Sequence, residues 1–137
     1  MIIGVISDTH GRMHDKAIRA LKDSDIIIHA GDIGSSQILE ELRKIAPVYA
    51  VKGNNDRDRW AWELPLTQAV EAGGRLIYVI HQLDMLDLDV RAAGIDIVIY
   101  GHSHVPGKEE RNGVLYFNPE KFADANTFKA NFSQKLF

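Results

Sequence analysis

The stretch that decides the fold is Ile26 to Gly34, with the sequence Ile-Ile-Ile-His-Ala-Gly-Asp-Ile-Gly. Its β-branched residues indicate a buried strand that ends at Gly31-Asp32 and therefore presents a carboxylate at its carboxyl end. Because a carboxylate has two oxygens, Asp32 is suited to bridge two metal ions. His29, inside the strand, is interpreted as a buried structural partner.

The same pattern, an apolar run followed by polar residues, recurs four times. The runs are Ile2 to Ser7 before Asp8-Thr9-His10, Val48 to Val51 before Gly53-Asn54-Asn55-Asp56, Leu76 to Ile80 before His81, and Asp96 to Tyr100 before Gly101-His102-Ser103-His104. In open α/β sheets, ligands bind outside the carboxyl ends of the strands, so we expect all five endings to face one pocket. Their carboxylate, imidazole and amide groups are ligands for metal ions.

The first half of the chain alternates strands with helices. Apolar residues recur at helical spacing between Met13 and Lys22, and a second helix, capped by Ser35 or Ser36, closes before Pro47. His14, on the first helix, is interpreted as a surface residue. The order βαβαβ with short links predicts a parallel sheet with right-handed crossovers.

The second half changes to hairpins and predicts a second sheet. Two pairs of short strands are joined by turns that accept positive φ, the second turn being Asn112-Gly113. The pairs are Thr67 to Val70 with Arg75 to Ile80, and Lys108 to Arg111 with Val114 to Phe117. Between them, Leu86 to Ala93 is expected to form a short helix that ends at Gly94.

The character of the chain shifts from Glu120 onward. Apolar residues spaced by three or four predict a helical stripe where a further strand was the alternative. They are Phe122, Ala125, Phe128, Phe132 and Leu136. A docked terminal helix and a loosely ordered tail both satisfy this pattern. We therefore expect one domain over residues 1–119 and a divergent C-terminal tail of the same domain over residues 120–137.

Composition excludes several classes of protein. At 137 residues and 15.4 kDa, with 45% hydrophobic and 26% charged residues, the chain suits one globular domain and neither a disordered nor a membrane-spanning class. No apolar run approaches the roughly 18 residues of a membrane helix, and cysteine is absent, so a cytoplasmic location is expected. A net charge of −3 without a basic stretch argues against nucleic-acid binding.

Taken singly, each candidate residue has a structural explanation. The structural alternative for Asp8 and Asp32 is a helix N-cap, and that for Asn54 is a turn residue. For His81 it is a hydrogen-bonded histidine of the core.

The joint pattern favours a metal site. Asp8 and His10 lie two residues apart at one strand end, and His102 and His104 repeat this spacing at another. Oxygen and nitrogen ligands of this kind suit manganese, iron, nickel or zinc better than calcium, without choosing among these four.

These motifs resemble, in order and context, those of the calcineurin-like metallophosphoesterases, and more closely the small single-domain phosphodiesterases of the YfcE type. The resemblance runs from Met1 to about Pro119. It implies a four-layer αββα sandwich, in which two mixed β-sheets are flanked by helices. It also implies two divalent metal ions as cofactors, with manganese first and iron, nickel or zinc as alternatives.

The resemblance further implies the ligands of each metal. One ion would be held by Asp8, His10, Asp32 and His104, and the other by Asp32, Asn54, His81 and His102. Two such ions share a water, lower its pKa to about 7 and neutralise charge on the phosphoryl oxygens. The expected function is that of a metal-dependent phosphoric diester hydrolase, in which a hydroxide bridging two divalent metals attacks a small phosphodiester in line.

The sequence departs from the family at several positions. The expected catalytic residues are Asp32, Asn54, Asn55, Asp56 and His102. Many relatives have a histidine general acid where this chain has Asn55, whose amide donates a hydrogen bond but no proton at neutral pH. Asp56 is expected to steady the site from behind the ligands. Gln82 stands where relatives usually place a glycine.

Two further positions bear on the substrate and on assembly. Arg57 and Arg59 are candidates to contact a nonbridging phosphate oxygen, with Arg57 taken as the substrate residue and a solvated surface arginine as the alternative for both. Beyond Asn118-Pro119 the chain lacks the strands that continue the family pattern, so an open sheet edge and a homo-oligomer are further expectations.

Other functions compete with the enzyme. A non-catalytic protein-interaction scaffold, like the retromer subunit of this fold, need not keep every metal-binding residue, whereas all seven positions are filled here. A nuclease is less well supported, because the chain has no basic channel to hold a strand.

Overall fold

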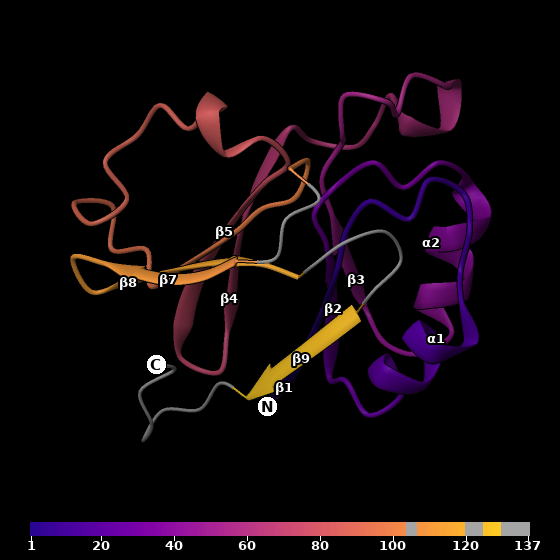
Figure 1. Ribbon diagram of the computed structural model, residues 1–137, viewed down its shortest axis with the longest axis horizontal. Helices are drawn as coiled ribbons and strands as arrows, with labels where there is room; N and C mark the ends of the chain where they lie inside the picture. Colours follow the sequence, from indigo (N-terminus) through magenta and orange to yellow (C-terminus); the bar gives the residue numbers. More distant parts are fainter. Residues whose placement is uncertain (104–106, 120–124, 130–137) are drawn as a thin grey trace.

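The computed structural model describes residues 1–103, 107–119 and 125–129, the last range by its backbone alone. The predicted βαβαβ unit is confirmed (Figure 1). Its elements are β1 (Ile2–Ile6), α1 (Asp15–Leu21), β2 (Ile26–His29), α2 (Ser36–Arg43) and β3 (Val48–Ala50). The three strands pair in parallel, with β1 next to β2 and β2 next to β3.

The edge of β1 is covered by a strand from the C-terminal part of the chain. β9 (Ala125–Lys129) pairs antiparallel with β1, so the sheet has the order β3-β2-β1-β9. The prediction of a helix is therefore wrong over residues 125–129. The apolar spacing suits a helix, but the hydrogen bonds with the backbone of β1 favour a strand. The expectation that no strand follows Pro119 is likewise wrong, because β9 covers the edge of β1. Phe122, Phe132 and Leu136 lie outside the described residues.

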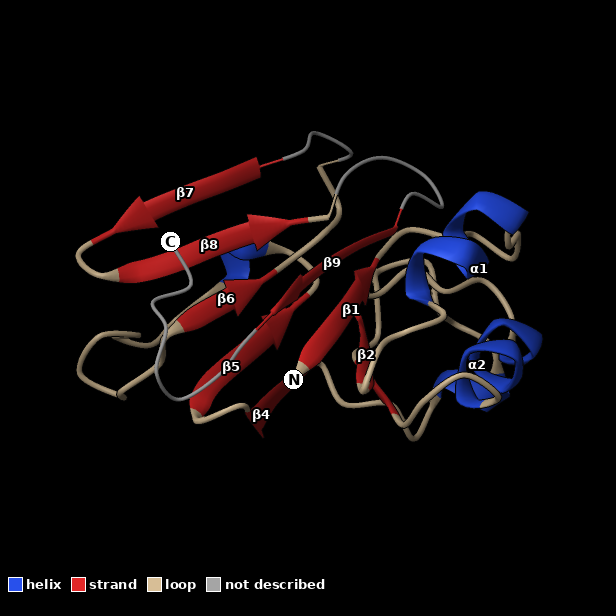
Figure 2. Cartoon of the chain, turned by 90° about the horizontal axis from the view of Figure 1, so that it is seen from below, coloured by secondary structure: helices blue, strands red, loops and turns tan. Residues whose placement is uncertain are grey.

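The second sheet is mixed and has the order β4-β5-β6-β8-β7 (Figure 2). Its strands are β4 (Thr67–Ala72), β5 (Arg75–Ile80), β6 (Ile97–Ile99), β7 (Gly107–Arg111) and β8 (Val114–Asn118). Both predicted hairpins are confirmed by the antiparallel pairs β4-β5 and β7-β8. At the second turn, Asn112 and Gly113 have φ values of 52° and 83°, which suits this dipeptide.

The two sheets pack face to face because their strands alternate side chains between two faces. On β1, Ile3 and Val5 enter the core between the sheets, whereas Ile6 joins the core beneath the helices. The helical core includes Leu21 of α1 and Leu42 of α2, both fully buried. The sandwich of two sheets predicted from the sequence is confirmed, and α1 and α2 both lie on the outer face of the first sheet.

The outer face of the second sheet is covered mainly by loop. This loop connects β5 to β6 and contains a short 3-10 helix, η2 (Leu83–Met85). A second 3-10 helix, η1 (Arg59–Ala61), lies before β4. The helix predicted over Leu86 to Ala93 is wrong, because Leu86 already adopts an extended backbone with ψ of 119°. Leu86 and Leu88 still pack against the sheet, so these apolar side chains are partly buried without a continuous helix. In the described ranges, no helix has the length and apolar character needed to cross a membrane.

Candidate metal centre

The polar side chains that follow five strands meet at one end of the two sheets. They are Asp8 after β1, Asp32 after β2, Asn54 after β3, His81 after β5 and His102 after β6. Backbone hydrogen bonds tie the first two endings together, since Asp8 N donates to Gly31 O at 2.9 Å and His10 N donates to Asp32 O at 3.0 Å. The convergence predicted from the strand endings is therefore confirmed for these residues.

Residues with strained backbone conformations cluster at this end of the two sheets. Of the non-glycine residues with positive φ in the described ranges, all but Asn112 are predicted ligands: Asp8, His10, Asp32 and His102, with φ values of 55°, 48°, 58° and 72°. Such conformations cost on the order of 1 kcal/mol or more each and persist where the surrounding structure enforces them. Strained residues of this kind are typical of functional sites.

Glycines allow the two sheets to approach each other here. A Cβ atom on Gly31, which has φ of 101°, would lie 2.6 Å from Nδ1 of His81. A Cβ atom on Gly101 would lie 2.6 Å from Oδ2 of Asp8. A side chain at either position would collide with a residue of the facing sheet, so glycine is required there. Each of these glycines directly precedes a predicted ligand, Asp32 or His102.

One group of potential ligands is formed by Asp8, His10 and Asp32. Nε2 of His10 lies 3.9 Å from Oδ1 of Asp8 and 3.9 Å from Oδ2 of Asp32. Both carboxylates are buried, whereas His10 is exposed to solvent. The atoms of this group lie within 4.8 Å of one another.

A second group is formed by Asp32, His81 and His102, again within 4.8 Å of one another. Nε2 of His81 lies 3.3 Å from Oδ2 of Asp32 and 3.1 Å from Oδ1 of Asn54. The same amide oxygen lies 3.2 Å from Nδ1 of His102. Asp32 belongs to both groups.

His81 is oriented by a backbone carbonyl. Its Nδ1–H donates to Ala30 O at 2.7 Å, which leaves Nε2 facing oxygen atoms of Asp32, Asn54 and Asp8. Burial by itself lowers the pKa of His81, but the hydrogen bonds to Asp32 and to Ala30 O and the nearby carboxylates raise it overall. A cation, whether a proton or a metal ion, is therefore favoured beside Nε2.

Asp32 is held by Asn55. The backbone N–H of Asn55 donates to Oδ1 and its side-chain amide donates to Oδ2, both at 2.9 Å. Burial by itself raises the pKa of Asp32, but the hydrogen bonds from His81 and Asn55 outweigh it and lower the pKa well below its usual range. Asp32 therefore stays ionised, as a ligand must.

Asp56 lies behind the ligands and joins two loops. Its buried carboxylate accepts backbone N–H groups of Ile33 and Gly34 at 3.1 Å each, and of Gly53 at 3.0 Å. It thus ties the loop after β2 to the loop after β3, which carries Asn54.

The remaining expectations have different outcomes. His104 lies outside the described residues. Arg57 is exposed, and its Nε donates to Asn54 O at 3.3 Å. Arg59 lies over the ring of Trp62, 5.6 Å from its centroid, on the surface.

The two histidines given structural roles match them. His29 is fully buried, accepts the N–H of Gly31 at Nδ1 and lies 3.0 Å from Thr9 Oγ1 at Nε2. His14 is exposed at the start of α1.

One contact was missed from the sequence. Nε2 of Gln82 lies 3.3 Å from Nε2 of His102, so this side chain steadies a predicted ligand. The signal was present, because Gln82 replaces a glycine and directly follows His81, but its partner lies 20 residues away in the sequence.

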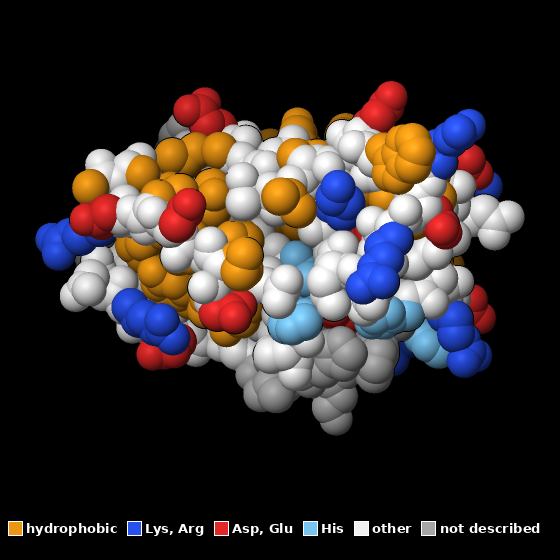
Figure 3. Space-filling model, turned by 90° about the horizontal axis from the view of Figure 1, so that it is seen from above, with side chains coloured by type: hydrophobic (Ala, Val, Ile, Leu, Met, Phe, Trp, Pro, Cys, Tyr) orange, Lys and Arg blue, Asp and Glu red, His pale blue; other side chains and the backbone are white. Residues whose placement is uncertain are grey.

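The donor set fits divalent metal ions. Carboxylates, imidazoles and one amide oxygen converge, and two groups of them share a carboxylate. Mixed nitrogen and oxygen donors suit transition metals. Figure 3 shows histidine side chains near the middle of one face of the molecule, between a hydrophobic area and several Lys and Arg side chains.

Comparisons with known proteins agree with this geometry. Residues 1–131 match the calcineurin-like phosphoesterase superfamily domain. A probable metallophosphoesterase of Methanothermobacter thermautotrophicus is 36% identical over 134 residues, which cover 87% of this chain and 76% of the relative.

Solved structures show the same fold. A novel archaeal phosphodiesterase is 28% identical with a TM-score of 0.74, over 90% of this chain and 86% of that one. YfcE of E. coli is 22% identical with a TM-score of 0.65, over 88% and 80%. Vps29 of Entamoeba histolytica, in complex with zinc, is 24% identical with a TM-score of 0.71, over 88% and 74%. With its motifs, fold and family match in agreement, the chain belongs to the calcineurin-like phosphoesterase superfamily.

Proposed function

We propose that the protein is a metal-dependent phosphodiesterase whose site takes two divalent metal ions. The observation that carries this proposal is that two groups of ligand atoms, each within 4.8 Å, share Asp32. A single carboxylate common to two groups suits a pair of ions that act together on one phosphoryl group. The family relationship and the similarity to an archaeal phosphodiesterase support this assignment.

The proposed ligands are those expected from the sequence. Asp8, His10, Asp32 and His104 would hold one ion, and Asp32, Asn54, His81 and His102 would hold the other. We place manganese first among the metals on the family resemblance, since oxygen and imidazole donors without a thiolate suit iron, nickel and zinc equally well.

Bound ions of this kind supply Lewis acidity, which activates a water for in-line attack on phosphorus and neutralises charge on the phosphoryl oxygens. The chain's own residues set the geometry for that chemistry. Asn55 orients Asp32 through two hydrogen bonds, and Ala30 O orients His81. His102 is exposed and is oriented by two side chains, since its Nδ1 lies 3.2 Å from Oδ1 of Asn54 and its Nε2 lies 3.3 Å from Nε2 of Gln82. Arg57, which is exposed, is proposed as a further contact to the substrate.

The decisive experiment combines metal analysis with an assay. The purified full chain should contain manganese after loading and should hydrolyse bis(p-nitrophenyl) phosphate only when the metal is present. Asp32→Asn should lower kcat by at least about a hundredfold, because the shared carboxylate loses its charge. Asp23→Asn, which changes an exposed carboxylate after α1, is the matched control and should leave the rate unchanged.

The alternative is a protein-interaction scaffold of the same fold. A chain that binds no metal and shows no turnover, while its circular dichroism spectrum remains that of a folded protein, would favour the scaffold. Metal binding without any diester hydrolysis would contradict the phosphodiesterase and retain the metal centre.

A further inference from the structure

A hollow of about 380 Å³ opens directly beside the candidate metal centre. Asn54 and His81 belong to both, and Gln82, which contacts His102, also lines the hollow. Cavities that bind small organic molecules have volumes of about 300 to 1,000 Å³, so the hollow has room for more than a phosphoryl group.

The walls of the hollow are largely apolar. Tyr78 and Ile80 are two residues apart on β5 and therefore point to the same face of the sheet, where they line it. Leu66, just before β4, and Met85, at the end of η2, line it from two other elements. Lys52, Thr67 and Asp87 supply polar groups.

Two lining residues are unusually exposed. Leu66 is 69% exposed and Met85 is 66% exposed, and both are among the large hydrophobic side chains that the described chain leaves in solvent. Leaving such side chains exposed forgoes the stabilisation of burying them. Their placement in one hollow beside a phosphate-handling centre points to an apolar group of the substrate as the partner.

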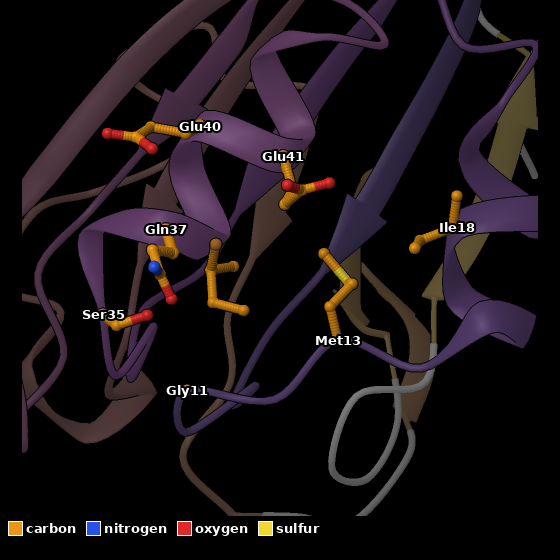
Figure 4. A pocket seen from close by; sticks show the side chains of 8 residues that line it. Gly11, Met13, Ile18, Ser35, Gln37, Glu40 and Glu41 are labelled. Atoms are coloured by element: carbon orange, nitrogen blue, oxygen red, sulfur yellow. The ribbon is translucent and has the colours of Figure 1, made fainter.

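A second hollow, of about 410 Å³, does not suit the same role. Figure 4 shows Glu40 and Glu41 on one of the helices that border it, with Met13 and Ile18 nearby. Two carboxylates repel an anionic phosphoester. None of the candidate ligands lines this hollow.

We propose that the hollow beside Asn54 and His81 binds an ester group of the substrate that carries an aromatic ring, and that it sets the preference of the enzyme for such phosphodiesters. The inference rests on the proposed function, because the phosphoryl group must lie at the metal centre for its ester group to enter the hollow. A ring suits the tyrosine face of Tyr78 and the thioether of Met85, which both interact favourably with aromatic groups. The ring belongs either to a simple aryl ester or to a nucleobase.

The test is a calorimetric titration of the manganese-loaded full chain with methyl phosphate and with phenyl phosphate. Both ligands carry the same phosphoryl group and differ in the ring alone. The wild type should bind phenyl phosphate roughly tenfold more tightly, because the ring buries apolar surface in the hollow. Adenosine 5′-monophosphate, as a third ligand, distinguishes a nucleobase from a directly attached aryl ring.

The variant Leu66→Ser/Met85→Ser removes two exposed apolar walls without touching a proposed ligand. It should bind phenyl phosphate and methyl phosphate equally, with methyl phosphate bound as in the wild type. The matched control is Trp62→Ser, which removes a side chain that is 66% exposed and does not line the hollow. It should keep the tenfold difference.

Kinetics provide a second measurement. The double variant should raise KM for bis(p-nitrophenyl) phosphate about five- to tenfold with little change in kcat, since the ring contributes binding energy and not chemistry. Equal binding of the two monoesters by the wild type, or a difference that survives in the double variant, would overturn the inference and leave the metal centre in place. Failure of methyl phosphate to bind at all would overturn the proposed function and this inference with it.

Discussion

Asn55 occupies a position where it serves Asp32 and not the leaving group. Both of its donors, the backbone N–H and the side-chain amide, are engaged with that carboxylate at 2.9 Å. An amide also has no proton to transfer at neutral pH. The residue therefore acts as a positioning group, which agrees with the departure from the family noted in the sequence.

This arrangement predicts how the rate depends on the leaving group. Without a general acid at Asn55, the leaving oxygen departs with negative charge, so hydrolysis should slow steeply as the pKa of the leaving alcohol rises. The measurement is kcat/KM for a series of aryl and alkyl diesters that share one ester group. Equal rates for aryl and alkyl leaving groups would show that another residue supplies the proton.

His29 gives the fold a pH dependence of its own. Burial, followed by the positive charge of nearby His81, lowers the pKa of His29 to about 3. In the unfolded chain the same imidazole takes up a proton near pH 6.5. As the pH falls below 6.5, the unfolded state therefore binds the proton first, and the free energy of unfolding decreases until about pH 3.

Urea unfolding at pH 6.5 and pH 5 tests this prediction. Stability should fall by up to about 1.4 kcal/mol per pH unit in this window, and His29→Gln should flatten the dependence because glutamine does not titrate. His14→Gln, at an exposed position, is the matched control and should retain it. A slope that is the same in all three proteins would contradict the assignment to His29.

At the scale of the elements, β9 shows how a distant segment completes the fold. The strand Ala125–Lys129 pairs with the whole of β1. The two strands are neighbours in the sheet, although more than a hundred residues separate them along the chain. Without this strand, the backbone groups of β1 would face solvent and template association with another chain.

Truncation tests the role of β9. A chain that ends at residue 119 should unfold at a lower temperature and self-associate, whereas a chain that ends at residue 130 keeps the pairing and is the control. Thermal unfolding and light scattering at increasing protein concentration measure the two effects. If both truncated chains behaved like the full chain, the pairing would contribute nothing to stability or to the prevention of self-association.

At the scale of the whole molecule, the candidate metal centre joins the two sheets. Asp8, Asp32 and Asn54 come from the first sheet, whereas His81 and His102 come from the second. An ion held between them would bind the folded state only, and would therefore stabilise the packing of one sheet on the other.

Manganese should accordingly raise the melting temperature of the chain. The pKa of His81 lies above its usual 6.5, so the ion must displace a proton from Nε2, and affinity should rise as the pH increases through that pKa. Calorimetry at pH 6.5 in two buffers with different ionisation enthalpies should detect a net release of protons when manganese binds. A melting temperature that manganese leaves unchanged would argue against an ion between the sheets.

Much of this architecture was accessible from local sequence. The strands around Ile26, Ile2 and Val48 and both hairpins were predicted within a few residues of their observed ends, because β-branched runs and turn dipeptides act locally. The helix expected after Leu86 was wrong, because its leucines pack against the sheet from a segment of loop and turns. The division of the chain at residue 119 stays a prediction.

The sequence by itself determined which residues stand at the carboxyl ends of the strands, and hence the donor groups of the candidate centre. Only the tertiary structure decided their partners: that Asn55 holds Asp32, that Gln82 lies beside His102, and that an apolar hollow opens next to His81. The physical reason is that strand propensity and turn chemistry act over a few neighbouring residues. Contacts between side chains depend instead on how two sheets, distant in sequence, pack against each other.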